Sequence, residues 1–161
     1  MNQSSTLTTS FLFASSVFFS SLSMAEGLLV VQDFTLEAKI SVKKEAPSLV
    51  LFMSKSCVYC EKVLQDFLLP MQRDHAYDDK VILRQIETGS TAKLIDFDGK
   101  VTTHRAFSIQ HKASAVPTVM LFDGRGRMLT QIVGLLTADY YLAYLDIAIN
   151  ESQDKIKAAA K

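Results

Sequence analysis

The spacing of apolar and polar residues predicts helices and strands that alternate along the chain. In residues 33–45, Phe34, Ala38 and Val42 recur at helical spacing, and Pro47 follows them. We therefore expect a helix with these three side chains on its inner face. Residues 48–54, SLVLFMS, form a continuous apolar run of strand length. Such a run is typical of a central strand that is covered on both faces.

A second helix is predicted after residue 57, and Pro70 predicts a kink within it. Its apolar positions keep helical spacing: Val63, Leu64, Phe67, Leu68 and Met71. Residues 80–88 predict the next strand, with Val81, Leu83 and Ile86 turned inward. Residues 88–103 are expected to form an irregular insertion or lid, with a turn at Asp98-Gly99.

The remaining residues predict a short helix, two strands and a closing helix. The short helix falls within 104–115, the strands cover 116–123 and 128–134, and GRGR between them (124–127) predicts a hairpin turn. Thr137 is the expected N-cap of the last helix and Asp139 lies in its first turn, where an acid complements the helix dipole. Residues 151–161 are expected to fray.

Composition and charge are those of an ordinary globular protein. The chain of 161 residues is 48% hydrophobic and 21% charged, with 17 basic and 17 acidic residues. These values exclude a disordered polyelectrolyte, and a balanced charge offers little attraction to phosphate, so we expect no nucleic-acid partner. The part that remains after removal of a targeting segment is long enough for one compact domain.

The first 25 residues carry the features of an export signal. An apolar and serine run extends from Phe11 to Leu22, and the small residues Ser23 and Ala25 follow, so we expect cleavage after Ala25 and a mature domain of residues 26–161. The run is too short for the roughly 20 residues that span a bilayer, so we expect no membrane span. Residues 1–10 contain no Lys or Arg, which leaves an uncleaved anchor or an extension as alternatives.

The candidate chemistry lies in SKSCVYCEKV, which holds both cysteines, Cys57 and Cys60, at C-x-x-C spacing. A structural staple is a poor explanation, because a bridge between them would close almost no loop. Zinc would need two more ligands, and His104 and His111 are separated by six residues rather than three to five. Each histidine, His75 included, stands among polar residues, which favours a surface position without a catalytic role.

Electron exchange fits the position of the pair better than metal binding does. At the start of a helix, Cys57 would face the unpaired N–H groups and the positive end of the dipole, which stabilise a thiolate. Cys57 is therefore the candidate nucleophile. Cys60 lies one turn later, within reach of its sulfur, and is the candidate resolving thiol.

Two segments together resemble the thioredoxin superfamily over about residues 33–150. They are the apolar strand that runs into CVYC and the distant VPTVMLFDGRGRMLTQIVG. Tyr59, the approach FMSKSC without tryptophan, and the segment with DFDGK resemble exported, periplasmic thioredoxin-like thiol–disulfide oxidoreductases of bacteria more than cytosolic thioredoxin. The resemblance implies an α/β thioredoxin fold, in which helices flank a central mixed β-sheet and an inserted segment precedes the cis-proline half.

The resemblance also implies the substrate site. Pro117 would be cis and lie against the cysteines, and Val116-Pro117-Thr118 would form a shelf that pairs with the substrate backbone. Tyr59 either shapes access to the sulfurs or donates a hydrogen bond near them, or it is only a surface contact. One position departs from the family: Leu51 stands where thioredoxin and the periplasmic disulfide oxidase carry a buried acid. Another group or water must then accept the proton of Cys60, and we assign none of three groups near in sequence, Glu45, Lys55 and Glu61.

These inferences predict a periplasmic thiol–disulfide oxidoreductase in which the Cys57–Cys60 pair exchanges electrons with partner proteins, with net reduction favoured. The alternatives are a disulfide oxidase or isomerase, and a non-catalytic binding module that has kept the thioredoxin fold. We expect a monomer with no cofactor beyond the redox-active disulfide. Its partners would be substrate proteins with thiols or disulfides and a protein that donates or accepts electrons.

Overall fold

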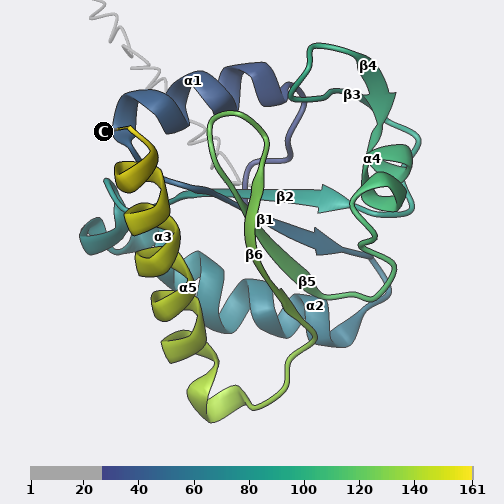
Figure 1. Cartoon of the computed structure of the whole chain (residues 1–161). Helices are drawn as coiled ribbons and strands as arrows, with labels where there is room; N and C mark the ends of the chain where they lie inside the picture. The colour runs from purple at the N-terminus through teal and green to yellow at the C-terminus, as the bar shows by residue number, and fades with distance from the viewer. Residues whose placement is uncertain (1–26, 161) are drawn as a thin grey trace, which may run out of the picture.

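A computed structural model describes residues 27–160, which form a four-stranded mixed sheet between two layers of helices (Figure 1). The export segment expected at residues 1–25 lies outside the described residues. The strands are β1 (Ser48–Met53), β2 (Ile82–Glu87), β5 (Thr118–Phe122) and β6 (Met128–Val133), in the order β2-β1-β5-β6. β1 pairs in parallel with β2 and antiparallel with β5, and β6 pairs antiparallel with β5. The α/β arrangement expected from the sequence, a central mixed sheet flanked by helices, is present.

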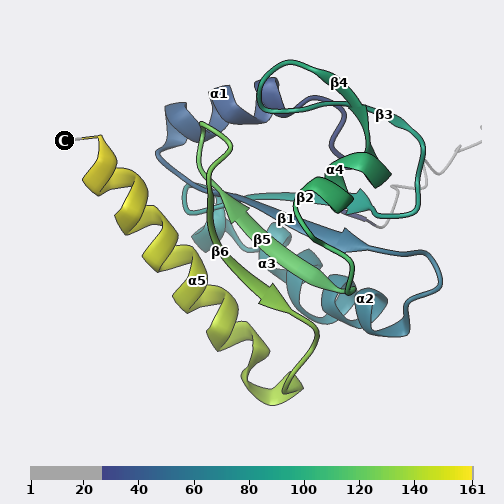
Figure 2. The ribbon, with the colours of Figure 1, turned by 45° about the vertical axis from the view of Figure 1, so that its right-hand side comes forward.

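The alternation of side chains along the central strands divides the core into two halves. In β1, Leu49 and Leu51 point to one face, and Val50 and Phe52 point to the other. The first face is covered by α2 (Val58–Val63), α3 (Leu69–Arg73) and α5 (Ala138–Ala159). The second is covered by α1 (Phe34–Lys44), α4 (His104–Gln110) and the inserted segment. Figure 2 shows these two layers from the side.

The inner face of α1 differs from the prediction. Asp33 caps the helix, because its carboxylate accepts the N–H of Thr35 at 2.7 Å. The buried positions are Phe34, Glu37 and Ser41, whereas Val42 is 66% exposed. The apolar spacing was misleading because the two polar residues find partners inside. Glu37 pairs with Arg84 at 2.8 Å, and Ser41 donates to the carbonyl of Ala46 at 2.7 Å.

The helix that follows the cysteines changes its winding before Pro70. A π-helical turn, Leu64–Leu68, separates α2 from α3, and the N–H of Leu69 donates to the carbonyl of Leu64, five residues back. Proline has no N–H, so the α-helical ladder is interrupted at Pro70. Where the sequence predicts a kink, the structure has a π-helical turn just before Pro70. A short 3₁₀ turn, His75–Tyr77, then leads to β2.

The inserted segment is a hairpin, and the expectation of an irregular segment is wrong. β3 (Lys93–Ile95) and β4 (Val101–Thr103) pair antiparallel. The predicted turn is present, with Gly99 at φ 78°, and the carboxylate of Asp96 accepts the N–H groups of Asp98 and Lys100 at 3.0 and 2.8 Å. Leu94 is fully buried in the core half under α1. The hairpin is therefore tied to the core.

The closing helix extends well beyond the predicted end, so the expected fraying of residues 151–159 is wrong. Ser152 is fully buried, and the side chains of Gln153 and Lys155 donate to the carbonyls of Asp79 and Leu129 at 3.3 and 3.0 Å. These contacts hold the last turns against the sheet. Thr137 occupies the predicted N-cap, although its side chain makes no capping bond within residues 27–160. In the same range, no helix is both long and apolar enough to cross a bilayer.

Candidate active site

Cys57 and Cys60 form a disulfide at the end of β1, with their Cα atoms 5.2 Å apart. After Met53 the chain turns, and the N–H of Cys57 donates to the carbonyl of Ser54 at 3.1 Å. Cys57 is the N-cap of α2, and its sulfur accepts the N–H of Cys60 at 3.1 Å. The predicted placement of the pair at a helix start is therefore present in the structure.

The two sulfurs differ in access. Cys57 is partly exposed, whereas Cys60 is fully buried in the first turn of α2. An incoming molecule can therefore reach only the Cys57 side of the disulfide without a rearrangement. Hydrogen bonding from a backbone N–H favours the charged form of a sulfur, so the helix start would favour the thiolate form of a reduced Cys57. The sulfur of Cys57 is therefore accessible to a partner, and the sulfur of Cys60 is buried behind it.

The shelf implied by the resemblance lies beside this disulfide. The Val116-Pro117 peptide is cis, and Thr118 begins β5 opposite Phe52, one residue before the end of β1. In both views the start of β5 lies next to the start of α2 (Figures 1 and 2). The N–H of Gly134 donates to the carbonyl of Pro117 at 2.7 Å, which fixes the position of Pro117.

Val116 offers a free backbone at the front of the shelf. It is partly exposed, and within residues 27–160 neither its N–H nor its carbonyl has a hydrogen-bond partner. Thr118 is buried, and its hydroxyl donates to the carbonyl of Ala115 at 2.8 Å. Val116 can therefore pair with an extended chain, while Thr118 holds the loop in place.

Known proteins share the sequence pattern and the fold of this chain. The profile described as a thioredoxin-like domain matches residues 34–149. The chain belongs to the thioredoxin-like domain family. Oxidised mitochondrial thioredoxin 3 from Saccharomyces cerevisiae is similar in fold, with 16% identity, a TM-score of 0.52, and coverage of 77% of this chain and 94% of that chain. Oxidised thioredoxin O2 from Arabidopsis thaliana has 19% identity, a TM-score of 0.50, and coverage of 80% and 96%. No curated protein sequence matches the chain.

Leu51, which stands where the resemblance implies a buried acid, lies in an apolar environment. Leu51 is fully buried among apolar side chains of the first core half. Glu45 ends α1 before β1 begins, so it lies at the far end of a strand of roughly 20 Å from the cysteines. Glu61 accepts the side chain of Gln65 at 2.9 Å. Both Glu45 and Glu61 are exposed, so neither replaces a buried acid.

Charged and aromatic groups at the rim are exposed. Lys55 pairs with Glu87 at 3.5 Å, at the end of β2 where the N–H of Thr88 donates to the carbonyl of Met53. Tyr59 is 64% exposed, and its hydroxyl has no hydrogen-bond partner within residues 27–160. This exposed position favours a surface contact over a hydrogen bond to the sulfurs.

Two of the three histidines are not at the surface, which corrects the sequence prediction. His75 is exposed, and its hydrogen bond to Asp78 at 2.9 Å raises its pKa. His104 is buried, and His111 is half-buried with its ring centre 4.3 Å from that of Phe107. Burial lowers the pKa of both. Their helical spacing with Phe107 was the signal for this inner face.

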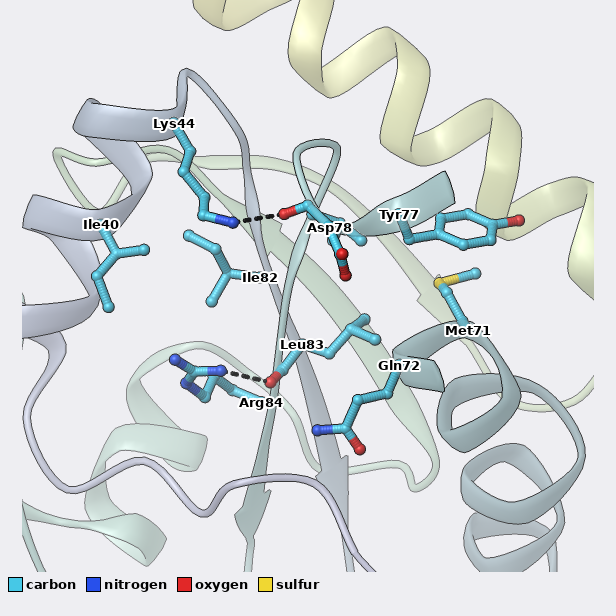
Figure 3. Close-up of a pocket in the computed structure, with 10 residues that line it drawn as sticks. Ile40, Lys44, Met71, Gln72, Tyr77, Asp78, Ile82, Leu83 and Arg84 are labelled. Atoms are coloured by element: carbon cyan, nitrogen blue, oxygen red, sulfur yellow. Dashed lines mark hydrogen bonds between the residues drawn. The ribbon is translucent and has the colours of Figure 1, made fainter. Parts of the chain in front are cut away.

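A separate hollow lies at the other end of the sheet, between α1, α3 and the start of β2 (Figure 3). Lys44 donates to the carbonyl of Asp78 at 2.5 Å, and Arg84 donates to the carbonyl of Leu83 at 2.8 Å. Because β1 and β2 are parallel, the start of β2 is opposite the end that carries the cysteines. The hollow is therefore not part of the redox site.

Proposed function

We propose that the protein is a periplasmic thiol–disulfide oxidoreductase that reduces disulfides in partner proteins. The observation that carries this proposal is the asymmetric pair, an accessible Cys57 at a helix start with a buried Cys60 behind it, beside the free backbone of Val116. Membership of the thioredoxin-like domain family supports the same chemistry.

The reaction begins from the reduced pair. The Cys57 thiolate attacks one sulfur of the partner disulfide, the partner S–S bond breaks, and the released partner thiolate takes up a proton. Cys60 then loses its proton and attacks the Cys57 sulfur of the mixed disulfide, which releases the second partner thiol. Two electrons have moved to the partner, and the Cys57–Cys60 disulfide remains. A protein dithiol must supply two electrons to restore the reduced pair.

The shelf positions the partner for this attack. An extended segment of the partner can pair with the backbone of Val116, as a strand adds to a sheet edge. Pro117 is buried and its carbonyl is bonded to Gly134, so the shelf is fixed before the partner binds. A fixed shelf lowers the entropy that binding must overcome.

The charges near Cys57 favour net reduction. A disulfide becomes strongly oxidising when its surroundings stabilise the reduced thiolate. Here the two residues between the cysteines, Val58 and Tyr59, are uncharged. The neighbouring Lys55 and Lys62 are both paired with carboxylates, Glu87 at 3.5 Å and Asp66 at 2.7 Å. The backbone of α2 is then the main stabilising group, which favours a low potential.

The deciding experiment is the reduction potential of the mature protein, measured by equilibration with glutathione or dithiothreitol buffers and thiol trapping. A value near or below about −250 mV supports a reductase. A value near about −120 mV would contradict the proposed direction and support an oxidase, which uses the same two cysteines.

A trapping experiment tests the roles of the two sulfurs. Cys60→Ser should attack partners but fail to release them, so mixed disulfides should accumulate in periplasmic extracts. Cys57→Ser should form none, and Ser56→Ala is the matched control that keeps the pair. If the double Cys→Ser protein retains the function of the wild type in cells, the protein is a binding module and not an oxidoreductase.

Export is part of the proposal and has its own test. Expression of the full chain in a bacterium, followed by fractionation and amino-terminal sequencing, should give a periplasmic protein that begins at Glu26. Recovery of the uncleaved chain from the membrane or cytoplasm would refute export and support an anchor or an extension.

A further inference from the structure

The two outer strands of the sheet differ in how their free edges are covered. The edge of β2 is partly closed, because the N–H of Val31 donates to the carbonyl of Gln85 and the N–H of Gln85 donates to the carbonyl of Leu29, both at 3.1 Å. On the other side, β6 pairs only with β5 among residues 27–160. The outer edge of β6 is therefore open at residues 130–133, while the carbonyl of Leu129 nearer its start accepts the side chain of Lys155 at 3.0 Å.

The register shows which backbone groups of β6 face outward. Val133 is opposite Thr118, and the N–H of Gly134 donates to the carbonyl of Pro117. In an antiparallel pair, hydrogen bonding alternates along the strand. Ile132 and Gly134 therefore direct their backbone groups to β5, whereas Gln131 and Val133 direct theirs outward. Within residues 27–160, these outward groups have no hydrogen-bond partner.

This strand lacks the usual protection of an open edge. Natural sheets discourage edge pairing with charged residues or proline. Residues 128–134, MLTQIVG, contain neither. A second identical strand can therefore approach β6 without placing like charges opposite each other.

An apolar stripe on α5 continues the open edge. Tyr140, Tyr144 and Ile147 follow helical spacing and are 63%, 43% and 54% exposed, and Leu136, just before the helix, is 78% exposed. In both views α5 runs beside β6 (Figures 1 and 2). A groove of about 440 Å³ lies between residues 130–133 and the side chains of Leu136, Tyr144 and Ile147, with Glu151 as its one charged lining residue. The stripe and the edge therefore form one surface.

We propose that a second copy of this chain occupies this surface and forms a two-fold symmetric dimer. An antiparallel β6–β6 pair centred on Ile132 brings Gln131 opposite Val133 of the second copy, and Val133 opposite its Gln131. Each such pair exchanges two backbone hydrogen bonds, so four form around the axis. The sheet then continues across both chains, and the two α5 stripes meet on the same face.

Self-complementarity and area favour a copy over a different protein. In a two-fold interface the same patch serves both sides, which an uncharged strand and an apolar stripe satisfy. The exposed parts of Val133, Leu136, Tyr140, Tyr144 and Ile147 amount to roughly 500 Å² per chain. With the paired backbone added, this approaches the approximately 800 Å² per partner of a standard interface. The proposed dimer differs from the monomer expected from the sequence.

Sedimentation equilibrium of the mature, disulfide-bonded protein tests the dimer. Between about 1 and about 500 µM we expect a rise from the mass of one chain to that of two, and no further. Gln131→Pro removes an outward donor that β5 does not use, and Tyr144→Glu places like charges across the axis; both should remain monomeric. Val101→Glu, an exposed apolar position on the hairpin, is the matched control and should dimerise normally.

Circular dichroism and the rate of disulfide reduction should be unchanged in all three variants, since none contacts the cysteines. This separates failure of the dimer from failure of the proposed redox function. A wild-type protein that stays monomeric at every concentration, or grows beyond two chains, would overturn the proposal. So would dimers of Gln131→Pro and Tyr144→Glu as stable as those of Val101→Glu.

Discussion

Substitution of Gly126 by alanine should be far more damaging than the same substitution at Gly134. Both glycines have positive φ angles, 76° and 75°, so alanine would impose the same left-handed backbone strain at each, about 1 to 2 kcal/mol. They differ in their surroundings. A Cβ atom at Gly126 would lie 2.5 Å from Cγ and 2.6 Å from Cβ of Phe97, whereas at Gly134 no atom of the described chain lies within 4 Å.

The Phe97 contact adds a second penalty at Gly126. A side chain can turn its ring away, but the Cβ of Phe97 moves only with its backbone, and the ring is stacked on Phe34 with centres 4.4 Å apart. Overpacking of this kind costs about 1 to 3 kcal/mol. We therefore expect Gly126→Ala to lose about 2 to 5 kcal/mol of unfolding free energy and Gly134→Ala about 1 to 2.

Urea unfolding of the oxidised proteins, followed by circular dichroism, measures this difference. The midpoints should separate while the slopes stay equal, because the surface exposed on unfolding is the same. Equal destabilisation of the two variants would refute the argument, since it would show that the inserted hairpin does not press on the β5–β6 turn.

Three further perturbations test the packing and the titratable groups. Leu94→Ala should lower the unfolding free energy by about 2 to 5 kcal/mol in urea titrations while disulfide reduction stays unchanged, and a neutral effect would mean that the hairpin lies outside the core. Burial lowers the pKa of His104 and His111, so below pH 6.5 the unfolded chain binds protons that the folded chain does not bind. The unfolding free energy should therefore fall as the pH falls from 6.5 to the folded pKa values, by up to about 1.4 kcal/mol per pH unit for His104. Glutamine at both positions should remove most of this pH dependence. Hydrogen bonds from Thr35 lower the pKa of Asp33, so Asp33→Ala should lose about 1 kcal/mol at pH 7, and this deficit should shrink as the pH falls below 3.8 through the folded pKa. A deficit that stays constant at every pH below 3.8 would contradict the capping role.

The central strands could be predicted because their apolar runs are continuous. β1 and β5 are buried on both faces, and such strands are readable from the sequence alone. Polar residues that are satisfied inside the core are not readable in this way. Glu37 lies on the inner face of α1 only because Arg84, 47 positions later, reaches it, and no local pattern reports that pairing. The hairpin strands were missed because each has only three residues.

The residues of the candidate site differ in how far the sequence alone predicted their positions. The spacing of Cys57 and Cys60 after an apolar strand led directly to a disulfide at a helix start, because every step is local. The position of Val116 and Pro117 came only from resemblance, since it depends on the pairing of β5 with β1. Gly134 was not identified, because its N–H acts on Pro117 from a different strand end.

The short segment before α1 sets a limit on proteolytic trimming. Leu28 and Val31 are buried in opposite halves of the core, and the backbone of Leu29 and Val31 brackets Gln85 on β2. A protease that removed residues up to Gly27 would leave all these contacts in place. One that cut four residues later would empty two core positions and open the edge of β2, so resistance to aminopeptidases should begin abruptly at Leu28.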